Sequence, residues 1–187
     1  MVVKFLAPAV FTALLLNATV SPAQTAAKET TLSADSSFIA TTGSLGLLQV
    51  ELGKLAQQKG SSPAVKEFGA RMVAEYSKLN GELAAGAKGA AYPAPVILRQ
   101  HQKTLDWFVS TGRSSFDKKY MAEMVSEHKE AARLFQQESE GGRVTSLKEL
   151  ASKLLPTVQQ HADLAAETAG SVGVQVTATT AQTRQGS

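Results

Sequence analysis

Cysteine is absent from the 187-residue sequence. The chain therefore forms no disulfide in an oxidising compartment, carries no thiol nucleophile, and offers no cysteine for a lipid anchor behind its N-terminal segment. Its stability must come from packing of the core.

An excess of charge of one sign is missing as well. The chain has 19 basic and 16 acidic residues, and the two signs are interleaved without a dense basic run. So small a net charge argues against a nucleic acid as the partner. The Gly-x-Ser-x-Gly elbow, the P-loop and the dinucleotide fingerprint are also absent from the sequence. These absences favour a protein that is not an enzyme.

Residues 1–23 are predicted to be a secretory signal peptide. Lys4 precedes an apolar run over residues 5–16, and small residues suit cleavage after Ala23. A retained membrane anchor is the alternative, but the run is short for a span of about 20 residues. It is interrupted by Pro8, Thr12 and Asn17. Cleavage would leave 187 − 23 = 164 residues in the periplasm or cell envelope, without a transmembrane helix.

Apolar residues recur every three or four positions through most of the remaining chain, which predicts an all-α protein. We expect a flexible segment over 24–32, one helical domain over 33–169, and a disordered tail over 170–187. The predicted long helices begin near Ser33, Ser62, Ser114 and Ser146, and a shorter helix spans about Leu98–Phe108. Ser62 is the predicted N-cap of the second long helix, and Ser146 and Glu149 have the spacing of a capping box.

An internal repeat relates the two halves of this domain. Residues 65–73 resemble residues 147–155, and residues 51–58 resemble residues 130–137, in the same order. The pairs of long helices therefore look like two copies of one helical hairpin, with chance similarity between amphipathic helices as the alternative. Two antiparallel hairpins joined by a long crossover form a ferritin-like four-helix bundle, here with a short crossover helix.

Four sequence blocks occur in the order that is typical of one bacterial family. They are residues 51–56 with 61–66 and 71–73, residues 101–102 with 105–106, residues 116–128, and residues 155–157 with His161. On these blocks the chain, from about Ser36 to Ala166, resembles the family called domain of unknown function 4142. The resemblance implies a ferritin-like fold and export, since members are mostly exported and often labelled as membrane or outer-membrane proteins. It implies no settled activity. Many members have histidine where this chain has Tyr76.

All three histidines, His101, His128 and His161, lie on apolar stripes of predicted helices. A buried neutral imidazole needs partners for both ring nitrogens, so each residue can be interpreted as a hydrogen-bonded core histidine. A second interpretation joins Glu51, Tyr76, His128 and His161, one from each long helix, as ligands of a single Zn²⁺, Fe²⁺ or Mn²⁺ ion. Glu51 lies only at the edge of its stripe.

An ordinary di-iron centre is not expected from this pattern. Such a centre needs a glutamate on each of two helices and Glu-x-x-His on the other two. Glu75 is followed three residues later by Lys78, and His161 is preceded three residues earlier by Val158. The pattern leaves a mononuclear site or no metal.

Three functions stay open at the level of the sequence. The favoured one is a non-enzymatic envelope protein, connected with stress or surface upkeep, that works by binding another envelope protein. The alternative is a metal-binding or redox protein with a reduced ferritin-like site in its core. The third is a protein that binds a small ligand inside the bundle. The sequence also leaves a homo-oligomer open.

Overall fold

The structure is a computed structural model that describes residues 22–175, with side chains from residue 34 onward. Most of the predicted signal peptide and most of the predicted tail therefore lie outside the described residues. Within them the chain forms α-helices and no strand. The helices are α1 (Pro22–Lys59), α2 (Pro63–Gly89), α3 (Arg99–Ser110), α4 (Arg113–Gly141) and α5 (Thr145–Ser171). The prediction of an all-α protein is confirmed.

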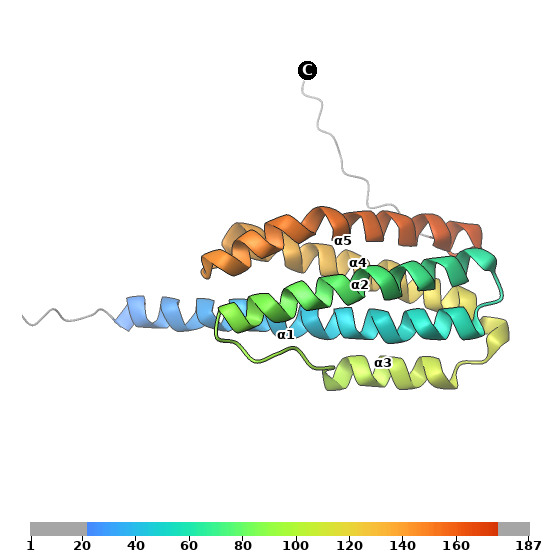
Figure 1. The fold of residues 1–187 in the computed structure, drawn as a ribbon, viewed down its shortest axis with the longest axis horizontal. Helices are drawn as coiled ribbons and strands as arrows, with labels where there is room; N and C mark the ends of the chain where they lie inside the picture. The colour runs from blue at the N-terminus through green and yellow to red at the C-terminus, as the bar shows by residue number, and fades with distance from the viewer. Residues whose placement is uncertain (1–21, 176–187) are drawn as a thin grey trace, which may run out of the picture.

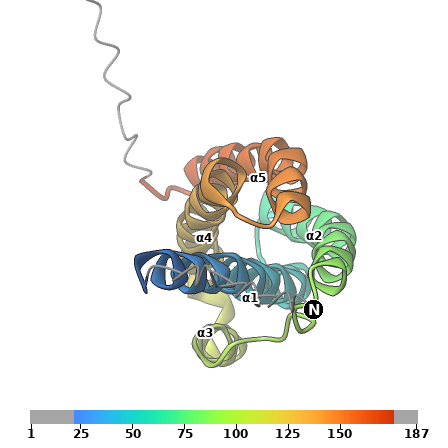
Figure 2. The same cartoon turned by 90° about the vertical axis from the view of Figure 1, so that its left-hand side faces the viewer.

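The four long helices pack around one core, and α3 lies outside it against α1 (Figure 1). Seen from the end, their order around the bundle is α1, α2, α5, α4 (Figure 2). Each neighbour runs in the opposite direction, so α1–α2 and α4–α5 are antiparallel hairpins (Figure 1). The connector over residues 90–98 and α3 carry the chain back along the bundle between the two hairpins.

Each long helix buries one stripe of apolar side chains, and burial of a large apolar side chain stabilises a fold by about 1.5–3 kcal/mol. Completely buried members include Leu48 and Leu52 of α1, Met72 and Leu83 of α2, Phe116 and Tyr120 of α4, and Leu147 and Val158 of α5. The helices α1 and α2 approach most closely at two glycines. A Cβ atom on Gly53 would lie 2.6 Å from the Gly69 carbonyl oxygen, and one on Gly69 would lie 2.7 Å from that of Gly53.

The start of α1 differs from the prediction. The helix begins at Pro22, so residues 24–32, which we expected to be flexible, are helical. This segment includes Ala26, Ala27, Lys28 and Glu29, all of which favour helix, and it contains no glycine or proline to interrupt one. At the other end, α5 continues to Ser171, close to the predicted domain end.

The loop between α1 and α2 is held by a carboxylate from α4. Asp117 accepts hydrogen bonds from the backbone N–H groups of Ser61 at 3.0 Å and Ser62 at 2.7 Å. Ser62 occupies the N-cap position of α2, and no side-chain cap bond forms there within the described residues. The carboxylate of Asp117 therefore takes the place of the predicted local cap.

The loop between α4 and α5 is held in the same way from α1. Asp35 accepts hydrogen bonds from the N–H groups of Arg143 at 3.0 Å and Val144 at 3.2 Å. The two donors and the acceptor of one contact each lie 82 positions from their counterparts in the other, because 143 − 61 = 82, 144 − 62 = 82 and 117 − 35 = 82. The equivalent contacts support two copies of one hairpin. The predicted capping box at Ser146 is wrong, since α5 begins at Thr145 with Val144 at its N-cap.

Candidate metal-binding site in the bundle core

Three of the predicted site residues meet in the core, each from a different helix. The ring centroids of Tyr76 on α2, His128 on α4 and His161 on α5 are 5.1–5.8 Å apart. Phe68, two turns before Tyr76, packs its ring 6.0 Å from that of His128. Both histidines are completely buried.

His128 presents a bare nitrogen to the core. Its Nδ1 atom lies 2.8 Å from the carbonyl oxygen of Met124, and a carbonyl only accepts, so Nδ1 carries the hydrogen. The Nε2 atom then has a free lone pair, and no described residue hydrogen-bonds to it. Burial lowers the pKa of His128 to about 4, so the ring is neutral at pH 7.

In His161 the free lone pair is on the opposite ring nitrogen, Nδ1. Its Nε2–H donates to the Glu75 carboxylate, which leaves Nδ1 as the atom with the lone pair. Within the described part of the chain, this Nδ1 atom also lacks a hydrogen-bond partner. Burial lowers the pKa of His161, and the nearby Glu75 carboxylate opposes that shift without reversing it. Both imidazoles are therefore neutral, and each is in a defined tautomer.

Glu75 connects this buried pair to the surface. Its side chain is 32% exposed and also accepts a hydrogen bond from Arg71 Nε at 2.8 Å. Burial alone would raise the pKa of Glu75, but the hydrogen bonds from His161 and Arg71 and the charge of Arg71 lower it overall. Glu75 is therefore ionised at pH 7, and it orients the imidazole of His161.

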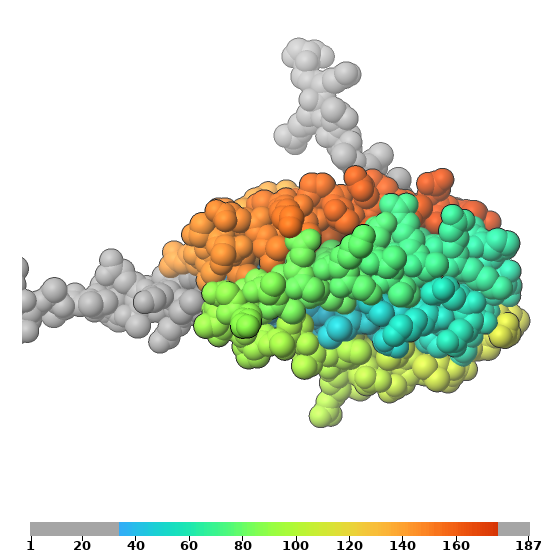
Figure 3. All heavy atoms as spheres, viewed as in Figure 1, coloured from blue at the N-terminus to red at the C-terminus, as the bar shows by residue number. Residues whose placement is uncertain are grey.

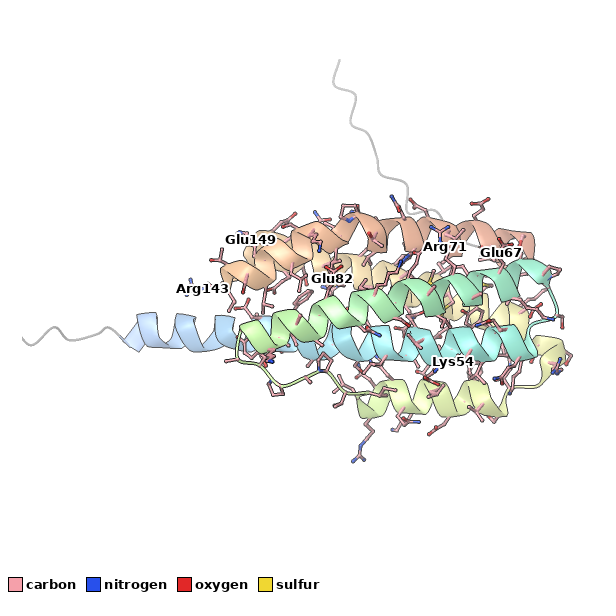
Figure 4. All side chains as sticks on the ribbon, in the orientation of Figure 1. Lys54, Glu67, Arg71, Glu82, Arg143 and Glu149 are labelled. Carbon is pink, nitrogen blue, oxygen red and sulfur yellow. The ribbon has the colours of Figure 1, made fainter. Side chains whose placement is uncertain are left out.

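A shallow groove between α2 and α5 reaches Glu75 from outside. Its volume is about 340 Å³, and its lining includes Arg71, Glu75, Lys78, Glu82, Thr157 and Gln160. Figure 3 shows the surfaces of α2 and α5 meeting along the bundle, and Figure 4 shows Arg71 and Glu82 beside this boundary. Because Glu75 lines this groove and also accepts from His161, its carboxylate links the buried imidazole to the surface.

The structure does not bring Glu51 to the cluster. Its side chain is 42% exposed and pairs with Lys54 at 2.6 Å on the same helix. Its place at the edge of the apolar stripe, which the sequence already indicated, turns the carboxylate outward. Glu75 was missed as a partner of His161, because the sequence does not fix which turn of α2 lies opposite that histidine.

Tyr76 is a weak candidate as a ligand. Burial raises its pKa well above the ordinary value, so the side chain is a neutral phenol.

His101 has a different role from the other two histidines. Its Nδ1 atom lies 2.5 Å from the hydroxyl of Ser44, which itself accepts a hydrogen bond from the backbone of Leu98. This contact fixes the start of α3 on α1.

The donor set does not fit a di-iron centre. Glu51 and Glu130, the two glutamates at matching places in the repeat, lie at the surface in ion pairs with Lys54 and Arg133. Over the described residues, no three His, Asp, Glu or Cys side chains gather closely enough to hold a metal ion. What the core offers is two imidazole nitrogens.

The hydrogen bonds on the far side of the two imidazoles are nevertheless of the kind that metal-binding histidines make. Metal-binding histidines typically donate their second N–H to a carboxylate or a backbone carbonyl, which fixes the tautomer and raises the basicity of the ligand nitrogen. Here Glu75 serves His161 and the Met124 carbonyl serves His128. The ring centroids are 5.8 Å apart. An ion bonded to two imidazole nitrogens at about 2.0 Å would separate the centroids by about 6 Å or less.

Fold and core together define an all-helical bundle protein with a pair of neutral histidines at its centre. The chain matches the family model described as Domain of unknown function (DUF4142) over residues 20–168, and it belongs to that family. Comparison with curated proteins and with solved structures finds no match. Within residues 22–175, none of the helices combines the length and apolar character that a membrane span requires.

Proposed function

We propose that this protein binds a single transition-metal ion through His128 and His161 in the core of a ferritin-like bundle. The observation that carries the proposal is the pair of completely buried, neutral imidazoles, each with one nitrogen oriented by a partner and the other bare. A bare buried acceptor destabilises the fold, and binding of a cation would offset that cost. The site is a reduced version of a ferritin-like centre, because its glutamate ligands are at the surface.

Elemental analysis of the full chain, purified without a histidine tag, tests this function. We expect a stoichiometric transition metal in the wild type and its loss in the His128→Leu, His161→Leu double variant. His101→Leu is the control, since His101 bonds to Ser44 outside the cluster. Metal-free wild-type protein that takes up no ion on titration with Zn²⁺, Fe²⁺, Mn²⁺ and copper would contradict the proposal.

Export is part of the same proposal. The N-terminal segment has one early charge, an apolar run and small residues before Gln24, and these features support export to the periplasm or cell envelope. Cell fractionation with N-terminal sequencing tests this step. A mature chain that begins at Gln24 supports it, and an intact N-terminus in the cytoplasmic fraction contradicts it.

A non-enzymatic role in binding an envelope protein is the second candidate function. It is favoured by exposed apolar side chains on α3 and the connector before it: Val96 is 66%, Trp107 47% and Val109 55% exposed. A photo-crosslinking residue at position 107 should then join the protein to one envelope partner in intact cells. The same residue at the exposed position 129 on α4 is the control. Equal crosslinking from both positions would remove this candidate.

A further inference from the structure

We infer that the ion held by His128 and His161 is copper(I). The inference rests on the proposed metal-binding function and narrows it from the Zn²⁺, Fe²⁺ and Mn²⁺ ions that the sequence suggested. Those ions take four or more donors in proteins. Copper(I), with a filled d shell, is stable with two nitrogen donors, and two are what the described core supplies.

The charge of the site leads to the same ion. The site is lined by aromatic rings, since those of Phe68 and Tyr76 pack 6.0 and 5.7 Å from the ring of His128, and the carboxylate of Glu75 already pairs with Arg71. The desolvation cost of a buried ion rises with the square of its charge, so a divalent ion costs about four times as much as a monovalent one. A buried, aromatic-lined interior therefore favours a monovalent cation over a divalent one.

Soft donors lie on the same buried stripes. Met72 is one turn from Tyr76 on α2, Met124 is one turn from His128 on α4, and both are completely buried. Thioether sulfur is a ligand that selects copper(I) over the harder divalent ions. The proposal includes one of these thioethers as a third ligand, reached by a change of rotamer, since methionine is unbranched and flexible.

Competition for copper(I) tests the inference. The full chain is titrated, without oxygen, against the coloured copper(I) complex of bicinchoninate, with ascorbate present to keep the copper reduced. We expect the wild type to withdraw one copper(I) per chain. The His128→Leu and His161→Leu variants should each lower the affinity more than 100-fold, and Glu75→Gln, which only reorients His161, by about 10–100-fold.

Variants of the buried methionines test the choice of copper(I) separately from the metal-binding function itself. Met72→Leu and Met124→Leu conserve side-chain volume and should weaken copper(I) binding without changing the helical circular dichroism. Met121→Leu, two turns from His128, is the matched control. If the histidine pair binds Zn²⁺ but withdraws no copper(I), the copper inference is overturned and the metal-binding function stands. If neither ion binds to the folded protein, both are overturned.

Discussion

A buried nitrogen without a hydrogen-bond partner costs a folded protein about 1–3 kcal/mol. Within the described residues His128 and His161 each carry one such atom, whereas both ring nitrogens of His101 lie near polar groups of Ser44 and Gln100. The three histidines look alike in the sequence, since all lie on apolar stripes. Their hydrogen-bond partners distinguish a structural histidine from a pair that is available to a ligand.

Replacement of His128 by leucine should cost the metal-free protein little. The variant loses the Nδ1 hydrogen bond to the Met124 carbonyl, but it also loses a buried acceptor, Nε2, that makes no bond to the described residues. Because these two effects oppose each other, we expect its free energy of unfolding to stay within about 1 kcal/mol of the wild type. His101→Leu removes the acceptor of the Ser44 hydroxyl and should cost about 1–3 kcal/mol. Urea unfolding of both variants, stripped of metal, checks the contrast. Equal losses in the two variants would show that His128 is as fully bonded as His101.

The free energy of unfolding should depend on pH through Glu138 on α4. Burial raises its pKa to about 7, and the charge of Asp35 and the hydrogen bond between the two side chains add to this shift. The folded state therefore holds this proton more tightly than the unfolded chain does. The contribution of Glu138 to stability is present at low pH and is lost as pH rises from about 4.5 to about 7.

The Glu138→Gln variant isolates this effect, because its amide donates to Asp35 at every pH. We expect the variant to gain stability over the wild type as pH rises through this range, and to keep that gain at pH 8. Thermal unfolding of both proteins at intervals between pH 4 and pH 8 measures the difference. A difference that does not change with pH would show that Glu138 ionises normally in the fold.

Helix ends are capped across the bundle rather than within each helix. Local sequence patterns indicated caps at Ser62 and Ser146, and the loops instead use Asp117 and Asp35, which are distant in the sequence. Such contacts depend on how helices pack, so local patterns do not predict them. Apart from the start of α1, the starts of the long helices were predicted closely, because Gly60, Pro63 and Gly141 interrupt or begin helices for local backbone reasons.

The cap at Asp117 can be tested by its removal. Asp117→Ala leaves the N–H groups of Ser61 and Ser62 without this acceptor and should lower the free energy of unfolding by about 1–2 kcal/mol. Asp106→Ala, on the exposed face of α3, is the control and should change it by less than about 0.5 kcal/mol.

Asp35→Ala should behave as Asp117→Ala does, because it removes the equivalent contact. The two losses should add within about 0.5 kcal/mol in the double variant, since the loops lie at opposite ends of the bundle. Chemical denaturation of the two single variants and the double variant measures this. A single variant without any loss would contradict the equivalence of the two hairpins.

At the scale of the whole molecule, the two hairpins were predictable and the alignment of their helices was not. The repeat at residues 51 and 130 implies a shift of 130 − 51 = 79 positions, whereas the caps are related by 82. The difference of three residues is nearly one helical turn, so it preserves the apolar stripe and is invisible to periodicity. The sequence therefore placed His128 and His161 inside but misplaced Glu51 and missed Glu75.

Because the histidine pair joins α4 to α5, metal binding should stabilise the whole bundle. A ligand that binds only the folded state adds about 2.7 kcal/mol when its free concentration is 100 times the dissociation constant. We expect the melting temperature to rise with added copper(I) in the wild type and to stay constant in the His128→Leu, His161→Leu double variant. Differential scanning calorimetry without oxygen checks this, and an equal rise in both proteins would place the binding elsewhere.

The state of the two imidazoles is measured most directly by ¹⁵N NMR of the histidine side chains in the metal-free protein at pH 7. We expect His128 to carry its hydrogen on Nδ1 and His161 to carry its hydrogen on Nε2, and we expect both rings to be neutral. The signals of the two bare nitrogens, His128 Nε2 and His161 Nδ1, should move on addition of copper(I) while those of His101 do not. A protonated ring, the opposite tautomers, or bare nitrogens unaffected by the ion would contradict the account.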